Sequence, residues 1–257
     1  MLMSALFNSL LATIIISLVS IIGIFFIFIK PKTVSKLNLF LVSLAIGCLL
    51  GDSFICLIPE SFEQLGFNYK PSLLLLGGII LFFILEKIIR WRHCHDPHCL
   101  FKEGQHKEGQ HVVTLNLIGD AVHNFIDGAL IAASFQISFS LGLTTSLAVL
   151  LHEIPEEISD FGVFIHYGLS IKRAALYNFL SALTSLLGVL FVFLVNFSIN
   201  NFSQFLIPIT AGGFIYLAAS DLIPELHRHE SKISTSLLQL SCIILGIGLT
   251  FLLSFLE

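Results

Sequence analysis

Two apolar segments of this 257-residue chain carry side chains that could bind a metal ion, at the spacing of a helix. The first segment is "LNLIGDAVHNFIDGALIAASF", residues 115–135. Its polar residues stand at positions i, i+3, i+4 and i+7, which share one face of a helix. Imidazole, amide and carboxylate groups are all ligands of divalent cations. The candidate ligands here are Asp120, His123, Asn124 and Asp127.

The second segment, "LLHEIPEEISDFGVF" (150–164), holds an imidazole and four carboxylates within nine residues. They again share one helical face, so two neighbouring helices would turn polar stripes toward each other. Pro155 removes the hydrogen bond to the Leu151 carbonyl, and the freed backbone can face a polar cavity. The candidate ligands here are His152, Glu153, Glu156, Glu157 and Asp160.

Ionised carboxylates are costly inside a membrane, the environment that the apolar residues of these two segments suit. An ionised group at the centre of a bilayer costs on the order of 2.5–3.5 kcal/mol. Neither segment contains Lys or Arg, so protons, water or bound cations must compensate the charge. One divalent cation would compensate two or three carboxylates at once. Asp52, Asp120 and Asp221 stand more alone, and for them a structural and a functional role remain equally open.

The composition indicates that helices in a membrane position these residues. Hydrophobic residues make up 56% of the chain, charged residues 12%, and the mean hydropathy is +0.94. Because about 20 apolar residues cross a bilayer as a helix, we predict an all-α, polytopic membrane protein with a single transmembrane domain, 1–257. The eight predicted spans are 5–29, 37–58, 71–91, 112–135, 140–165, 173–198, 204–226 and 233–256.

Basic residues predict the orientation. Every Lys and Arg except Lys70 lies in or beside the loops after spans 1, 3, 5 and 7. The positive-inside rule places these loops in the cytoplasm and both termini outside the cell. We therefore expect an integral protein of the cell (plasma) membrane with extracellular termini.

Two segments of similar sequence indicate an internal repeat. "GCLLGDSFICLIPE" (47–60) and "GGFIYLAASDLIPE" (212–225) end spans 2 and 7, which run in opposite directions. This pattern is typical of inverted-topology transporters, with spans 1–3 and 6–8 paired around spans 4 and 5. The alternative is convergent use of Pro-Glu at the end of a helix.

The only long hydrophilic segment is "RHCHDPHCLFKEGQHKEGQH", 92–111, a His-rich loop predicted on the cytoplasmic side. Its spacing fits no fixed zinc-finger pattern, so a flexible loop that gathers metal and a solvated linker both remain open. Its candidate ligands are His93, His95 and His98, with Cys94 and Cys99 between and beside them.

The motifs "HNFIDG" (123–128) and "HEIPEEISDF" (152–161) resemble the paired signatures of the ZIP (Zrt-, Irt-like) divalent-metal transporters. The resemblance implies a binuclear metal site, uptake of Zn²⁺ or a related ion into the cytoplasm, and a homodimer. Glu157 and Asp160 match only an extended form of the second motif, and Ser185 stands where some members carry Glu. The ligands that the resemblance implies are His123, Asn124, Asp127, His152, Glu153 and Glu156.

We therefore expect a transporter rather than an enzyme, with alternating access to a site between spans 4 and 5. The cargo is Zn²⁺ first, with Fe²⁺, Mn²⁺ and Co²⁺ as further candidates, because the ligands are imidazole and oxygen without thiolate. No catalytic cofactor and no nucleic-acid partner are expected. The alternatives are an intramembrane zinc metalloprotease, because His-Glu-x-x is half of that motif, and a proton-coupled cation carrier of another class.

Overall fold

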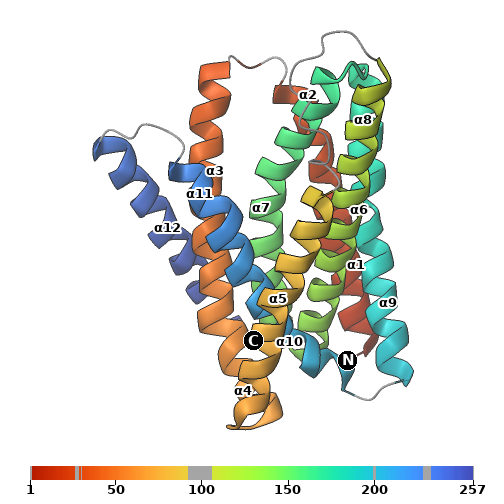
Figure 1. Cartoon of the computed structure of the whole chain (residues 1–257). Helices are drawn as coiled ribbons and strands as arrows, with labels where there is room; N and C mark the ends of the chain where they lie inside the picture. Colours follow the sequence, from red (N-terminus) through yellow and green to blue (C-terminus); the bar gives the residue numbers. More distant parts are fainter. Residues whose placement is uncertain are drawn as a thin grey trace.

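The computed structural model describes residues 2–26, 29, 31–91, 106–198, 201–227 and 233–256. Every regular element among these residues is a helix, which confirms the all-α prediction (Figure 1). In chain order the elements are α1 (Leu2–Val19), η1 (Ser20–Ile22), α2 (Gly23–Phe26), α3 (Pro31–Gly51), η2 (Asp52–Leu57), α4 (Ile58–Leu65), α5 (Tyr69–Trp91), α6 (His106–Ile137), α7 (Phe139–His166), α8 (Ile171–Ala182), α9 (Thr184–Ser198), α10 (Phe202–Leu217), η3 (Ala218–Leu222), α11 (Ile223–His227) and α12 (Ile233–Leu253).

Helix covers each segment that was predicted to span the membrane. Among the described residues, six helical segments are long and apolar enough to cross a bilayer. Helices α6 and α7, which carry the acidic stripes, are not among these six, so a count of eight spans stays a prediction. The six segments are Leu2–Phe25, Lys36–Leu65, Tyr69–Ile88, Ile171–Ser198, Phe202–His227 and Ile233–Leu253.

The start of α6 and the course of α7 differ from what the sequence suggests. Helix α6 begins at His106, inside the predicted loop 92–111, because Lys, Glu and Gln in this stretch favour a helix. Residues 92–105 lie outside the described part of the chain. Pro155 lies inside α7, which nevertheless continues from Phe139 to His166 as one helix.

The helices run up and down, and both chain ends lie at the lower end of the bundle in Figure 1. Helix α3 descends toward α4, whereas α10 ascends toward α11, so these two helices are antiparallel. The helix ends that adjoin the basic loops lie together at the upper end: α2 and α3, α5 and α6, α7 and α8, and α11 and α12.

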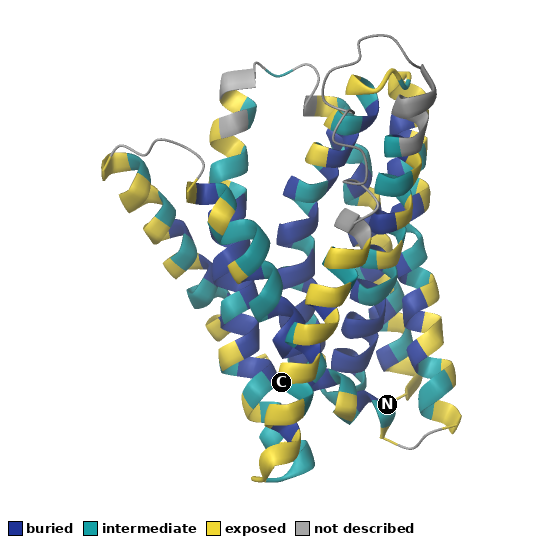
Figure 2. Cartoon of the chain, in the orientation of Figure 1, coloured by how far each residue is buried: buried dark blue, intermediate teal, exposed yellow. Residues whose placement is uncertain are grey.

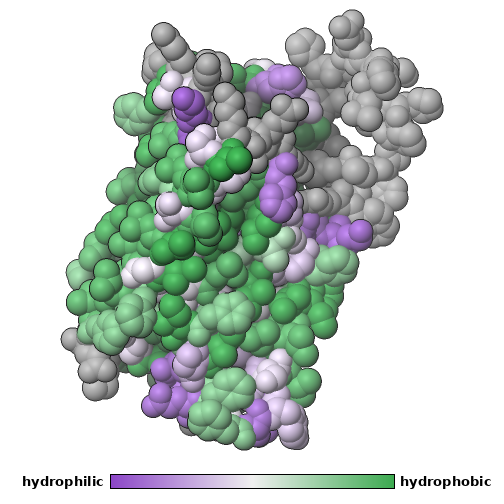
Figure 3. Space-filling model, turned by 90° about the vertical axis from the view of Figure 1, so that its left-hand side faces the viewer, coloured by the Kyte–Doolittle hydropathy of each residue, from purple (hydrophilic) through white to green (hydrophobic). Residues whose placement is uncertain are grey.

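The outside of the bundle is apolar. Figure 2 shows buried residues gathered in the interior and exposed ones along the outer faces of the helices. Large side chains such as Phe7, Leu73 and Leu194 are exposed there. In Figure 3 hydrophobic atoms form a broad middle zone, with hydrophilic atoms gathered nearer its two ends. Such a surface suits lipid rather than water.

Glycines allow three helix pairs to approach backbone to backbone. A Cβ on Gly128 of α6 would lie 1.9 Å from the Ser185 carbonyl oxygen of α9. A Cβ on Gly246 of α12 would lie 2.4 Å from a carbonyl of α3, and one on Gly212 of α10 would lie 2.1 Å from a carbonyl of α5. Close contacts through small residues are how helices associate within lipid.

The two LIPE motifs share an unusual local structure. Each follows directly on a π-helical turn, η2 in the first case and η3 in the second, and the Leu of each motif closes that turn. Proline has no N–H group to donate, and wide π turns accommodate such a break within a helix. The similarity of residues 47–60 and 212–225 therefore extends from sequence to backbone geometry.

The α5–α10 contact can be tested with two adjacent glycines. A Cβ on Gly78 would lie 2.3 Å from the Ile209 carbonyl oxygen, whereas one on Gly77 would have nothing within 4 Å. We expect Gly78→Ala to destabilise the protein by about 1–3 kcal/mol through overpacking. Gly77→Ala should be neutral or stabilising by up to about 1 kcal/mol, because Ala favours helix. Thermal unfolding of the purified protein in detergent measures both, and equal melting temperatures would contradict the packing described.

Candidate metal centre

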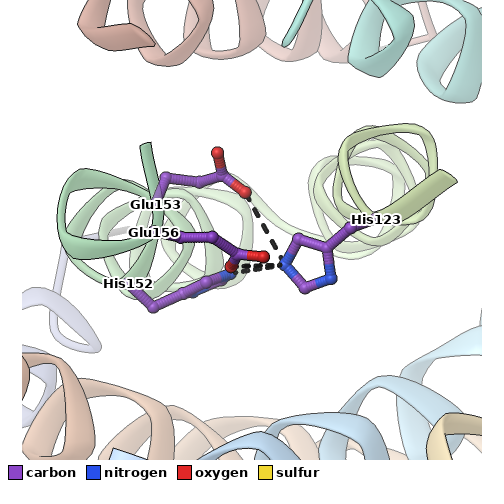
Figure 4. A group of neighbouring side chains, drawn as sticks. All are labelled: His123, His152, Glu153 and Glu156. Atoms are coloured by element: carbon purple, nitrogen blue, oxygen red, sulfur yellow. Dashed lines mark hydrogen bonds and ion pairs between the residues drawn. The ribbon is translucent and has the colours of Figure 1, made fainter. Parts of the chain in front are cut away.

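The polar stripes of α6 and α7 face each other. The two helices pack side by side, and Figure 4 shows His123 of α6 pointing toward His152, Glu153 and Glu156 of α7. One ligand atom from each of these four residues lies within 4.8 Å of all the others. The shared chamber that the sequence predicts between the two segments is therefore present in the fold.

His123 lies at the centre of this cluster. Its Nε2 atom is 3.3 Å from His152 Nε2 and 3.4 Å from Glu156 Oε2. It is also 3.5 Å from Asp127 Oδ2 and 3.6 Å from Glu153 Oε1. Two imidazoles and three carboxylates thus surround one small volume, which we call the His123–His152 cluster.

A backbone contact sets the orientation of the His152 ring. Its Nδ1 atom lies 2.9 Å from the Ala148 carbonyl oxygen, which can only accept a hydrogen bond. Nδ1 therefore carries a proton, and in the neutral ring Nε2 presents its lone pair 3.1 Å from Asp127 Oδ2. Two acceptors face each other at this distance, so a proton or a metal ion between them is required to hold them together.

The cluster is buried at its base and open at its rim. Asp127, His152 and Glu153 are buried, whereas the Glu156 side chain is 39% exposed. Asp127 Oδ1 and Glu153 Oε1 are buried without a hydrogen-bond donor. Buried acceptors of this kind are costly unless a ligand satisfies them.

A cavity of about 740 Å³ extends from the cluster to residues of α11, a helix that lies in the upper part of the bundle in Figure 1. His123, His152 and Glu156 line its inner part, and its outer part reaches Asn38 of α3 and Glu225 of α11. On the other side of the cluster, residues 130–133 of α6 are buried and apolar.

Asn124 is buried, and its side-chain amide is held by Asp120, one turn earlier on α6. Its Nδ2 atom donates to Asp120 Oδ1 at 2.8 Å, and Asp120 also accepts a hydrogen bond from the Ser181 hydroxyl. Because the amide nitrogen is engaged with Asp120, the amide oxygen is the atom of this side chain that could bind a metal ion. Such outer contacts fix the orientation of a metal ligand.

The remaining predicted ligands do not join the cluster. Glu157 and Asp160 belong, with Asp120, to a second buried group beside α8. Asp160 accepts a hydrogen bond from Asn116 Nδ2 at 3.0 Å, and Asn178 Nδ2 donates to the Glu157 carbonyl at 3.1 Å. The loop candidates His93, His95 and His98 lie outside the described residues.

Three further positions singled out in the sequence have other surroundings. The Ser185 hydroxyl donates to the Ala182 carbonyl at 2.7 Å and lies 3.2 Å from the Ser17 hydroxyl, so it is bonded away from the cluster. Asp52 is fully buried and accepts a hydrogen bond from Thr145 at 2.9 Å. Asp221 lines the cavity.

Sequence reasoning missed Asn116, Asn178 and Ser181. Asn116 stands four residues before Asp120, on the same face of α6, so its spacing could have identified it. Asn178 and Ser181 are polar residues three positions apart in an apolar span, a weaker signal, because such residues commonly satisfy the backbone of their own helix.

The whole chain is similar in sequence to a known protein family and to several known proteins. A family model described as "ZIP Zinc transporter" matches residues 4–111 and 93–254. The chain is 30% identical to "Zinc transporter zipt-7.1" of Caenorhabditis briggsae, over 84% of this chain and 71% of that protein. It is 31% identical to "Zinc transporter ZIP13 homolog" of Drosophila melanogaster, over 86% and 78%. It is 30% identical to "Metal cation symporter ZIP14" of Xenopus tropicalis, over 83% and 60%.

Removal of one central imidazole tests the cluster as a binding site. We expect His152→Ala to weaken Zn²⁺ binding by the purified protein at least about tenfold, since loss even of an outer contact to a metal ligand costs that much. Competition with a chelator of known affinity measures the change. His166→Ala, at the exposed end of the same helix, is the matched control and should bind as the unsubstituted protein does. Equal affinity of the two variants would exclude His152 as a ligand.

Proposed function

The chain belongs to the ZIP zinc transporter family, and on that premise we propose that it carries a divalent metal ion across the membrane through the His123–His152 cluster. Members of this family are transporters and not enzymes. The cargo proposed is Zn²⁺, with Fe²⁺, Mn²⁺ and Co²⁺ as weaker candidates. The resemblance of residues 123–128 and 152–161 to the family's motifs is confirmed by the match over most of the chain.

One observation carries the proposal. His123 Nε2 and His152 Nε2 lie 3.3 Å apart with three carboxylates around them, and no Lys or Arg stands between residues 108 and 171. A dication would be bound by these groups and would compensate their charge, as protons would in its absence. Mixed imidazole and oxygen ligands without thiolate favour Zn²⁺ and its neighbours over Cu(I).

The proposed ligands are His123, Asp127, His152 and Glu156, with Asn124 and Glu153 beside them. Glu156 adds a carboxylate to the ligand set, which favours Mn²⁺ and Fe²⁺ relative to a site richer in histidine. A protease would need both imidazoles on one helix in a His-Glu-x-x-His frame, whereas here the second imidazole comes from α6. This arrangement supports transport over proteolysis.

The proposed direction of transport, uptake into the cytoplasm, is the one that the family resemblance implies, and the cavity supports the proposed orientation. In the sequence every Lys and Arg except Lys70 lies in or beside the loops after spans 1, 3, 5 and 7, and the cavity extends toward the end of the bundle where the described helix ends adjoining these loops lie. The positive-inside rule assigns that end to the cytoplasm and both termini to the outside. The conformation described is then the inward-facing one, and uptake into the cytoplasm is the proposed direction. A homodimer in the cell membrane, as the family resemblance implies, completes the proposal.

We propose that the chain crosses the membrane eight times, and that α6 and α7 cross it surrounded by the other helices. The half formed by spans 1–3 and the half formed by spans 6–8 would be inverted repeats of each other. Three observations support this: the antiparallel course of α3 and α10, the π turn before each LIPE motif, and the glycine contacts α3–α12 and α5–α10. Exchange of the two halves converts one of these contacts into the other.

Alternating access would then move the α6–α7 pair relative to α3 and α10. In the conformation described, the buried apolar residues 130–133 separate the cluster from the outside, together with Leu141 and Val149 of α7. Opening of this layer and closure of the cavity around Tyr216 and Leu217 would present the same ligands to the other side.

Flux measurements test the assignment. Purified protein in liposomes that contain a Zn²⁺-sensitive dye should take up Zn²⁺, and His123→Ala and Glu156→Ala should each lose nearly all of that uptake because the dication loses a ligand. His166→Ala serves as control and should transport normally. Unimpaired uptake by both cluster variants would refute the proposed function.

Orientation can be tested with an impermeant thiol reagent on cells, in a background without Cys94 and Cys99. Ser159 lines the cavity, whereas Glu63 is exposed on α4 at the opposite end. We expect Glu63→Cys to react in intact cells and Ser159→Cys to react only after permeabilisation. The reverse pattern would contradict the proposed orientation.

A further inference from the structure

Asp52 is a buried acid that lies away from the His123–His152 cluster. It begins the π turn η2, which continues α3 toward α4 at the lower end of the bundle in Figure 1. The side chain is fully buried and does not line the cavity. Its partner Thr145 stands about two turns before His152 on α7. Asp52 therefore lies on the same side of the cluster as the buried apolar residues 130–133, which is the outer side in the proposed orientation.

A chain of hydrogen bonds starts at this carboxyl group. The Thr145 hydroxyl lies 2.9 Å from Asp52 Oδ2 and 3.0 Å from the Ser134 hydroxyl, and the Ser134 hydroxyl lies 3.0 Å from the Leu130 carbonyl oxygen. Each hydroxyl has one proton to donate. If Asp52 is protonated, it donates to Thr145, Thr145 donates to Ser134, and Ser134 donates to the carbonyl, so every contact holds a proton. If Asp52 is ionised, both hydroxyls must turn toward it and the contact with the carbonyl is lost.

The surroundings of Asp52 also favour its protonated form. The turn η2 packs against α3, α4, α7, α10 and α12. Lys36 stands about four turns before Asp52 on α3, while α4, α10, α12 and residues 139–151 of α7 contain no Lys, Arg or His. Asp52 Oδ1 is buried without a hydrogen-bond donor, and burial of an unpaired ionised carboxylate is costly. The titratable side chains on these segments supply no positive charge: Cys48, Cys56, Glu60, Glu63, Tyr216 and Cys242.

The bond between Asp52 and Thr145 crosses the boundary that alternating access must open. Asp52 belongs to the segment that continues α3, whereas Thr145 and Ser134 belong to the α6–α7 pair. Motion of this pair relative to α3 would separate Asp52 from Thr145 and admit water, in which an aspartic acid is ionised at neutral pH. Asp221, in the π turn η3, lines the open cavity and is only half-buried. The two π turns thus carry one acid that is closed off and one that lines the cavity.

We propose that Asp52 controls the outer side of the protein through its proton: it is protonated and bonded to Thr145 while that side is closed, and ionised when that side opens. Closure takes one proton from the outer solution onto Asp52, and opening returns it to the same solution. This residue therefore carries no proton across the membrane. A low pH outside favours the closed form, and a high pH favours the open form. The assignment of the outer side rests on the proposed transport function.

Labelling of a cysteine in the apolar layer measures the opening. Ala133→Cys, in a background without Cys94 and Cys99, places a thiol among buried residues of α6. The purified full chain in detergent, without metal, is treated with a thiol reagent at a series of pH values. The same chain without Ala133→Cys gives the contribution of the remaining thiols.

The decisive quantity is the labelling rate of this cysteine divided by its rate in Asp52→Asn. Asn can donate to Thr145 but cannot ionise, so this variant should stay closed, and the ratio cancels the pH dependence of the thiol itself. While the open form is the minor one, the ratio should rise with pH by up to about tenfold per unit, the limit for one coupled proton. Glu63→Gln, which removes an exposed acid at the same end, should label as the unsubstituted chain does.

A ratio that does not change with pH would overturn the proposal. Thr145→Val keeps the acid and removes its partner, so labelling should still rise with pH but be about twofold to tenfold faster at every pH. If melting temperatures show that Asp52→Asn is misfolded, Thr145→Val decides, and labelling as slow as in the unsubstituted chain refutes the role of this contact. These measurements use no metal. Zn²⁺ uptake by His123→Ala and Glu156→Ala would refute the proposed function whatever the labelling shows.

Discussion

Compensation of buried negative charge is the constraint on which this structure depends. Six acidic residues lie on the polar stripes of α6 and α7, and the chain offers no Lys or Arg between residues 108 and 171 to pair with them. Each such charge within a bilayer costs on the order of 2.5–3.5 kcal/mol. The two helices must therefore turn their polar faces together, admit water from one end and bind positive charge. Transport depends on the same compensation of charge, because the transported cation supplies the positive charge that the carboxylates of the site need.

The other helices provide an apolar enclosure for this polar pair. Helix α9 approaches α6 closely through Gly128, while the pairs α3–α12 and α5–α10 make similar backbone contacts farther out. Their outer faces expose large apolar side chains, and the layer at 130–133 closes one side of the cluster. The metal-ligating side chains of the His123–His152 cluster therefore lie inside the bundle, at the inner part of the cavity.

The spacing of the polar residues predicted the facing stripes well, because a period of 3.6 residues determines which side chains share a helical face. It also located the helices to within a few residues. The division of the stripes into two groups was not predictable, since it depends on α8, whose Asn178 and Ser181 contact α7 and α6 from a distant part of the sequence. The π turns before the LIPE motifs likewise leave no periodic signal, although Pro59 and Pro224 mark their positions.

The π turns also bear on the history of the chain. A π turn holds one residue more than an α turn, so each records the equivalent of a single-residue insertion into a regular helix. The turns η2 and η3 end at the same Leu of their respective motifs. If one half of the molecule arose by duplication of the other, this insertion was already present in the ancestral three-helix unit. The irregular turn would then be older than the duplication itself.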